Sequence, residues 1–153
     1  MKNTVTYALA LVVGAVMLFA TGMPSAAFAS ESVAIVKTLD GEATIIRGDQ
    51  RMPAALGSTI EENDVVETSA SGSVGLLFED DTQLSLGPNS RATIDEFVYN
   101  PDQSGSFVAK LWKGTLGFIT GKVGKTTPEN VRVETPLATI GVRGTAFVVS
   151  VDE

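Results

Sequence analysis

The chain has 153 residues and a net charge of −7, from 11 Lys and Arg against 18 Asp and Glu, and it contains neither His nor Cys. This composition excludes histidine-based catalytic pairs, zinc sites built from imidazole or thiolate, and disulfides. The acidic balance argues against nucleic-acid binding, which needs a basic surface. We therefore expect no metal, no other cofactor and no nucleic-acid partner.

Residues 1–29 have the pattern of a secretory signal peptide. Lys2 is the only charged residue among them, residues 7–23 are apolar or small, and the triplet AFA ends at Ala29. The pattern predicts cleavage between Ala29 and Ser30, so that the chain contacts the membrane only transiently and reaches the periplasm or the extracellular space. An uncleaved anchor is the alternative, because residues 7–23 approach the shortest apolar length that spans a bilayer.

Residues 30–153 form one predicted domain, and its size is sufficient for a hydrophobic core without disulfides. Apolar residues alternate with polar or small ones in six stretches, which predicts short strands. These stretches are 73–78, 83–86, 107–112, 131–134, 138–142 and 145–151. The expected fold is all-β, either as two packed, twisted antiparallel sheets or as a short solenoid-like coil of strands.

Three stretches carry a resemblance to a known family. Residues 76–90 read LLFEDDTQLSLGPNS, residues 111–116 read LWKGTL, and residues 131–147 read VRVETPLATIGVRGTAF. The last stretch holds the family motif, which comprises Thr135, Pro136, Ala138, Gly141, Val142, Arg143, Gly144, Thr145 and Phe147. Together the stretches resemble the FecR domain over about residues 41–151.

The resemblance implies an all-β domain outside the cytoplasm that receives a signal from an outer-membrane receptor and passes it inward. Type members carry a cytoplasmic anti-sigma segment before a membrane span. Only six residues precede the apolar stretch here, so we expect no such segment in this chain.

Trp112 and Arg143 are the two candidate partner contacts. Trp112 is the only Trp and shares one strand face with Val108 and Lys110, so it either faces a partner or lies under a second layer. Arg143 stands between Gly141 and Gly144 and binds either groups of its own fold or a carboxylate of a partner.

The acidic triplet Glu79-Asp80-Asp81 has the composition of a turn between two strands. The chain contains no nucleophile elbow, P-loop or dinucleotide fingerprint. We therefore expect a non-catalytic module. The resemblance implies a role in signalling at the cell envelope, where we expect the module to bind or scaffold an unknown protein through a strand edge or a sheet face.

Two alternatives are a cell-wall or polysaccharide-binding protein and a glycan hydrolase that uses Asp80 and Asp81. The sequence also leaves self-association into a homo-oligomer open.

Overall fold

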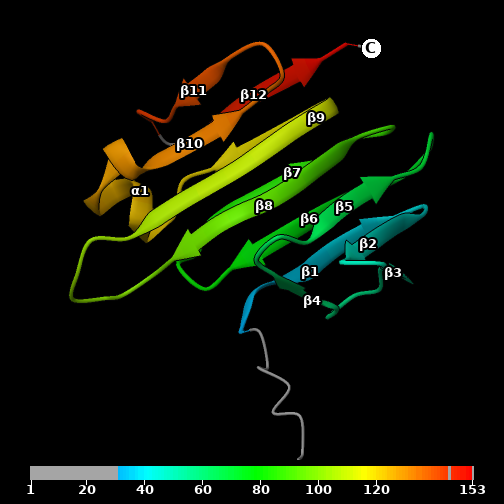
Figure 1. The fold of residues 1–153 in the computed structure, drawn as a ribbon, viewed down its shortest axis with the longest axis horizontal. Coiled ribbons are helices and arrows are strands. Elements are labelled where there is room, and N and C mark those ends of the chain that lie inside the picture. Colours follow the sequence, from blue (N-terminus) through cyan, green and yellow to red (C-terminus); the bar gives the residue numbers. More distant parts are fainter. Residues whose placement is uncertain (1–30, 145, 153) are drawn as a thin grey trace, which may run out of the picture.

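The structure is a computed structural model, and it describes residues 31–144 and 146–152 (Figure 1). The predicted signal peptide, its cleavage site between Ala29 and Ser30, and Thr145 of the motif lie outside the described residues. Among the described residues, no helix is long and apolar enough to cross a membrane.

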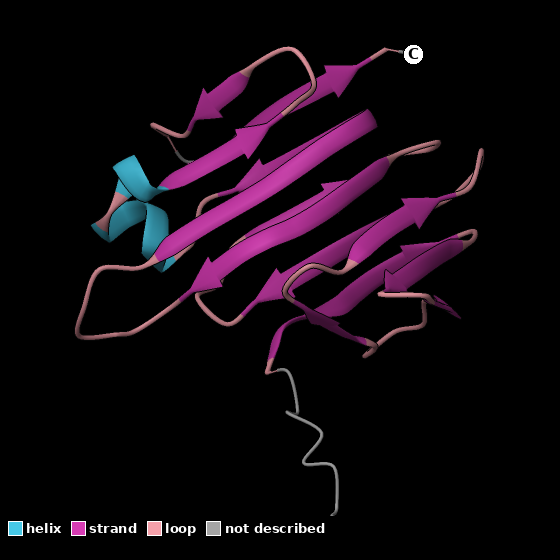
Figure 2. Ribbon diagram, in the orientation of Figure 1, coloured by secondary structure: helices cyan, strands magenta, loops and turns pink. Residues whose placement is uncertain are grey.

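Strands make up most of the described chain, which confirms the all-β prediction (Figure 2). The strands are β1 (Ser32–Asp40), β2 (Ala43–Arg47), β3 (Gln50–Pro53), β4 (Thr59–Glu61), β5 (Val65–Thr68), β6 (Ser73–Phe78), β7 (Gln83–Leu86), β8 (Arg91–Val98), β9 (Ser106–Ile119), β10 (Val131–Glu134), β11 (Thr139–Gly141) and β12 (Ala146–Val151). Two short helices, α1 (Lys122–Thr126) and η1 (Pro128–Asn130), follow β9 at one end of the molecule (Figure 2).

The strands lie in two layers that belong to one curled sheet (Figure 1). Sheet A has the order β4–β1–β6–β7–β9–β12, and sheet B has the order β3–β2–β5–β8–β9–β10–β11. The long strand β9 belongs to both layers. Its first half pairs with β8 and β10 in sheet B, and its second half pairs with β7 and β12 in sheet A.

The pairing of β9 with β10 is parallel, whereas the other strand pairs among the described residues are antiparallel, as in the first of the two predicted architectures. The reason is the connection: α1 and η1 carry the chain from the end of β9 back to the level at which β9 begins, so Val131 pairs with Phe107. The sequence pattern predicted no helix here. A helix as short as α1 offers no periodic apolar stripe to detect.

The core lies between the two layers and is built from the alternating residues of the strands. Val74, Leu76 and Phe78 of β6 are each at most 2% exposed, as their period of two predicts. Five phenylalanines form a continuous chain of ring contacts, with neighbouring centroids 4.9 to 6.1 Å apart. They are Phe78, Phe97, Phe107, Phe118 and Phe147.

The chain crosses between the layers at four stacked turns, which we call the corner edge. Three of them are loops, at residues 41–42, 69–72 and 87–90, and the fourth is the bend inside β9 at residues 113–115. Backbone hydrogen bonds connect each turn to the next: Ser69 N–H to the Glu42 carbonyl, Asn89 N–H to the Ser69 carbonyl, and Gly87 N–H to the Thr115 carbonyl. The four crossings of the corner edge are thus joined to one another by a row of backbone hydrogen bonds.

Gly114 makes the last of these turns. Its φ is +85°, and a Cβ there would overlap the hydroxyl of Ser90 and lie 2.5 Å from the Ser90 Cα. The space is filled by Ser90 itself, whose Oγ accepts a 2.9 Å hydrogen bond from the Thr115 N–H. The bend of β9 from one layer into the other therefore depends on a glycine at this position.

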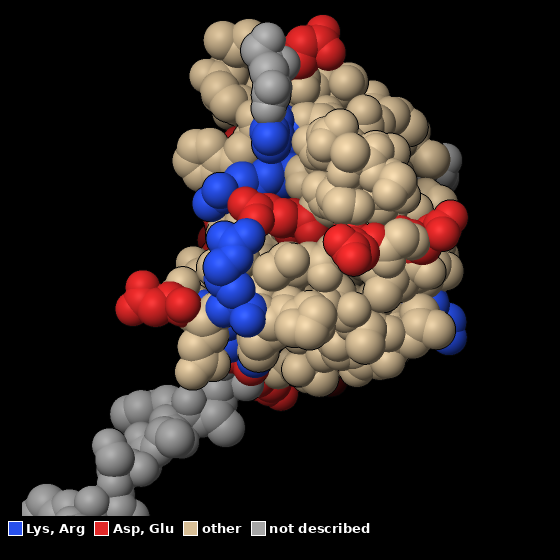
Figure 3. All heavy atoms as spheres, turned by 90° about the vertical axis from the view of Figure 1, so that its right-hand side faces the viewer, with Lys and Arg blue, Asp and Glu red and all other residues tan. Residues whose placement is uncertain are grey.

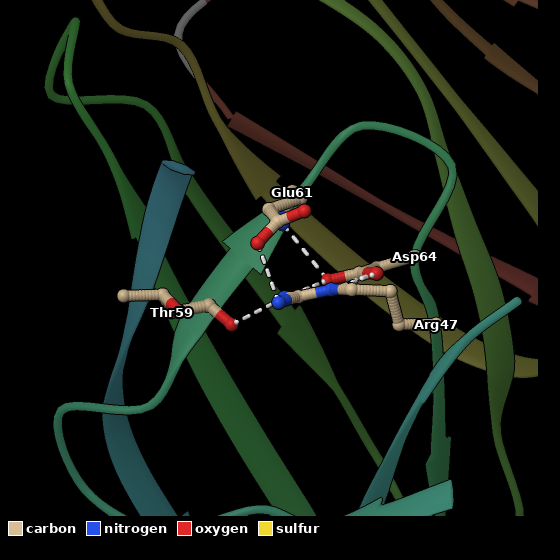
Figure 4. A network of polar contacts seen from close by, with 4 residues as sticks. All are labelled: Arg47, Thr59, Glu61 and Asp64. Carbon is tan, nitrogen blue, oxygen red and sulfur yellow. Dashed lines mark hydrogen bonds and ion pairs between the residues drawn. The ribbon is translucent and has the colours of Figure 1, made fainter. Parts of the chain in front are cut away.

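The opposite rim of the molecule is closed by Arg47 at the end of β2 (Figure 4). Its guanidinium donates to both carboxylate oxygens of Asp64, forms an ion pair with Glu61 and donates to the carbonyl of Thr59. Asp64 is fully buried. These contacts raise the pKa of Arg47, chiefly through the hydrogen bond to Asp64. The network joins β2 of sheet B to β4 of sheet A.

Candidate binding surfaces

A β-bulge in β9 places Trp112 on the outer surface of sheet B. Leu111 pairs with Ala92 and Lys113 pairs with Arg91, so Trp112 is the extra residue between two consecutive pairs. Leu111 is fully buried in the core, whereas Trp112 is 44% exposed. Because of the bulge, Trp112 and Lys113 both lie on the outer side of the sheet, where simple alternation would send Lys113 inward.

Trp112 is held in place by two neighbours although it is exposed. Its indole Nε1 donates a 2.9 Å hydrogen bond to the hydroxyl of Thr93 on β8. The ammonium of Lys110 lies 4.1 Å from the centroid of the ring, in a cation–π contact. The indole is therefore a half-exposed aromatic surface with a fixed orientation, and it lies outside the core.

Charged residues surround Trp112 on this surface. Arg51 and Arg91, from β3 and β8, each donate one hydrogen bond to Glu67 on β5, at 2.6 and 2.9 Å. We use the name Trp112 face for the outer surface of sheet B formed by Arg51, Glu67, Arg91, Thr93, Asp95, Glu96, Lys110, Trp112, Lys113, Arg132 and Glu134. When the corner edge faces the viewer, Lys and Arg side chains form a column along one side of the molecule (Figure 3).

Asp95 lies at a second bulge, between the pairs that Ile94 and Glu96 make with β9. Burial raises the pKa of Asp95, and the nearby carboxylate of Glu134 adds to the rise, while Lys110 opposes it. The Trp112 face is therefore basic at the corner edge and carries carboxylates farther along β8.

The first part of the family motif forms the turn between β10 and β11. The hydroxyl of Thr135 accepts a 3.0 Å hydrogen bond from the Ala138 N–H and donates to the Ala138 carbonyl at 3.1 Å. Pro136 and Leu137 lie at the exposed tip of the turn. Thr135 thus closes the turn with its own side chain.

The second part of the motif fixes the end of the domain. Val142 is 4% exposed, and its N–H donates to the carbonyl of Val131. The carbonyl of Gly144 accepts a 2.8 Å hydrogen bond from the hydroxyl of Thr120. Phe147 on β12 stacks against Phe118, with the ring centroids 5.3 Å apart. These motif residues hold β11 and β12 against the rest of the core.

Arg143 is exposed, and no hydrogen bond or ion pair of its side chain is found within residues 31–144 and 146–152. It lines a cleft of about 280 Å³ between β11 and β12, with Ile140 and Phe147 among its other walls. Arg143 and Trp112 do not share a site. Gly141 lies level with Arg132 and Val108, and the chain from Gly141 to Arg143 runs away from Trp112.

Asp80 has a structural position. It is fully buried, and its carboxylate accepts hydrogen bonds from the N–H of Thr82 at 2.9 Å, the hydroxyl of Thr82 at 2.7 Å and the N–H of Val123 at 3.0 Å. It therefore ties the turn between β6 and β7 to the start of α1. Asp81 is exposed and forms an ion pair with Lys122. The two carboxylates do not face each other across a substrate site.

Alternation along the sequence predicted neither the bulge at Trp112 nor the grouping of Arg51, Arg91 and Lys113 on one surface. The signal for the bulge is the order Leu-Trp-Lys-Gly, in which a strict period of two breaks just before a glycine. The grouping of the basic residues depends on strand order, which no local pattern encodes.

A family model described as FecR protein matches residues 64–153. The chain belongs to this family. No curated protein and no solved structure gives a significant match. The matched region contains the complete motif and most of the Trp112 face, so the resemblance drawn from the sequence is confirmed. FecR membership supports a signalling-related regulatory domain associated with the cell envelope.

Proposed function

We propose that this FecR-domain chain is an exported, non-catalytic protein that binds a protein partner at the cell envelope as part of a signalling process. The observation that carries the proposal is the fixed, 44% exposed indole of Trp112 on the outer surface of sheet B. Exposed tryptophans are among the residues that contribute most to protein–protein binding energy.

The surroundings of Trp112 favour binding. The hydrogen bond to Thr93 and the contact with Lys110 already restrict the ring, so that less side-chain freedom is lost when a partner docks. Polar and charged residues surround the ring, as at the rim of a protein interface.

The alternative of a glycan hydrolase receives no support from the carboxylates that the sequence analysis selected. Asp80 is buried and engaged by three donors, and Asp81 lies on an exposed turn. A retaining or inverting hydrolase needs two carboxyl groups that face each other, about 5 to 10 Å apart, across the scissile bond.

Site-specific photo-crosslinking in the producing cell tests the proposal. A photoreactive amino acid replaces Trp112 in one variant and Gln83 in a control variant, because Gln83 is exposed on the outer surface of sheet A. We expect one dominant protein adduct at position 112 that is absent at position 83. Equal adducts at both positions, or none at 112, would overturn the proposal. Adducts with wall glycan at 112 would favour the polysaccharide-binding alternative.

Export is tested on the same cells. Fractionation and N-terminal sequencing should recover an envelope or secreted form that begins at Ser30. A chain that retains its first 29 residues in the membrane fraction would support the anchored alternative.

A further inference from the structure

We propose that the corner end of the Trp112 face docks an acidic, extended segment of the partner protein, with Arg51, Arg91 and Lys113 as the residues that recognise its carboxylates. This inference rests on the proposed function, because it specifies the chemistry of the partner that Trp112 binds.

The distribution of charge is the first argument. The chain has a net charge of −7, and ten of its Lys and Arg residues follow residue 30. Five of these ten lie on the Trp112 face, together with four of the 18 Asp and Glu. The five are Arg51, Arg91, Lys110, Lys113 and Arg132. An acidic protein that concentrates its cations on one sheet surface is complementary there to an acidic partner.

The hydrogen bonding of the arginines is the second argument. Within the described part of the chain, Arg51 and Arg91 each make one hydrogen bond, and both bonds go to Glu67. One carboxylate is thus shared between two guanidinium groups that carry five N–H donors each. Their side chains are 62% and 45% exposed, so the remaining donors are open to a carboxylate from outside.

The register of the strands is the third argument. Lys113 pairs with Arg91, and Arg91 pairs with Glu67, so that these residues form a row across β9, β8 and β5. Trp112 precedes Lys113 at one end of the row. Arg51 lies one row farther from the corner edge, level with Ile46, and its side chain reaches the row by donating to Glu67. Neighbouring strands are about 4.8 Å apart, so a segment of a few residues laid across them reaches both the indole and the cations.

The size of the cationic group favours a short protein segment over a polyanion. A nucleic acid or a long anionic polymer binds through an extended basic surface and is repelled at long range by an acidic protein. Here the three recognising cations, Arg51, Arg91 and Lys113, lie near one end of sheet B, and Asp95 and Glu96 follow them along β8. A short acidic segment can contact the cations without meeting the rest of the negative charge.

The fluorescence of Trp112 provides the test, because it is the only Trp in the chain. The purified protein is titrated with a short peptide that alternates Glu and Ala, and with a matched peptide in which Gln replaces Glu. We expect a saturable change with the Glu peptide that weakens with salt, and no change with the Gln peptide. The double variant Arg91→Gln/Lys113→Gln should weaken binding roughly tenfold or more.

The matched control is the double variant Lys37→Gln/Lys125→Gln, which removes the same charge from exposed positions on β1 and α1. It should bind the Glu peptide like the parent protein. Thermal unfolding of both variants establishes that each is folded. Equal weakening in the two would show a general charge effect and would overturn the inference.

Two further outcomes separate this inference from the proposed function. If the crosslink at position 112 captures a protein whose contact peptide lacks acidic residues, the acidic specificity is wrong while protein binding stands. If polygalacturonate binds at the Trp112 face more tightly than the Glu peptide, the occupant is an anionic polysaccharide and the inference is wrong. A captured contact peptide rich in Asp and Glu supports both the proposed protein binding and the acidic specificity.

Discussion

Arg47 and Asp64 form a two-point contact between guanidinium and carboxylate, with Nε to Oδ1 at 2.9 Å and Nη2 to Oδ2 at 2.6 Å. The same carboxylate accepts a 2.8 Å hydrogen bond from the Glu61 N–H. A single residue from β2 thereby holds the turn that follows β4. The Arg47–Asp64 contact thereby connects the two layers at the rim opposite the corner edge, where no strand belongs to both layers.

Arg47→Met should therefore destabilise the protein by about 3 kcal/mol, because it leaves the buried carboxylate of Asp64 without its cation. Arg51→Met is the matched control. It removes an exposed arginine that also pairs with a carboxylate, and it should cost less than about 1 kcal/mol. Urea unfolding of the two variants measures the difference. Equal losses would contradict the closing role of Arg47.

Asp80→Ala should destabilise the protein by about 3 kcal/mol, because three buried donors lose their acceptor. The effect should be concentrated at α1, where Val123 loses its hydrogen bond. Asp81→Asn should change stability by no more than about 0.5 kcal/mol, since Asp81 is exposed and Asn tolerates its positive φ. Hydrogen exchange combined with thermal unfolding checks both statements. Similar results for the two would show that Asp80 does not anchor α1.

Gly114→Ala should destabilise the protein by about 3 kcal/mol or more, because the new Cβ meets the backbone of Ser90 in addition to the strain of φ +85°. Gly48→Ala separates the two causes. Gly48 also has a positive φ, but a Cβ there meets nothing within 4 Å, so the cost should be about 1 kcal/mol. Melting temperatures of the two variants measure the difference, and equal losses would show that the contact with Ser90 contributes nothing.

Gly144→Val should cost about 1 to 3 kcal/mol from backbone strain alone, since φ is +148° and the space around the residue is open. Chemical denaturation measures this cost. An unchanged free energy of unfolding would show that the turn before β12 relaxes freely.

Asp95→Asn should raise the melting temperature slightly at neutral pH. The pKa of Asp95 is raised in the folded state, so the folded protein binds more protons than the unfolded chain between the ordinary pKa of 3.8 and the raised value. The contribution of Asp95 to the free energy of unfolding is therefore fully present at low pH, and it is lost as the pH rises through the raised pKa. The gain from Asn should shrink as pH falls below 3.8, and melting curves at neutral and acidic pH test the trend.

Local pattern identified β6, β7, the first half of β9, β10, β11 and β12, but it did not identify β1 to β5 or β8. The alternation of Val74, Leu76 and Phe78, and of Val131 and Val133, predicted which side chains are buried, because burial on one face imposes a period of two. The parallel pairing of β10 could not be predicted in this way, because it depends on where α1 returns the chain. The two bulges, at Trp112 and Asp95, also depend on the partner strand.

The candidate site was only partly accessible to sequence reasoning. Trp112 was selected because it is the only Trp, and its face was predicted from alternation. Its association with Arg51 and Arg91 requires the order β3–β2–β5–β8–β9, which brings residues 61 and 21 positions before Trp112 onto its surface. Arg143 was selected from the motif, and the motif gives no information on which groups surround its side chain.

The passage of β9 through both layers has a consequence for biosynthesis. Seven strands that precede β8 and β9 in the chain form only partial sheets on their own, because β9 stands between β8 and β7 and joins the two halves. The earlier strands therefore remain incompletely paired until residues 106–119 have emerged from the ribosome. The domain should acquire protease resistance late in synthesis and in a single step, with truncations before Ile119 remaining sensitive throughout.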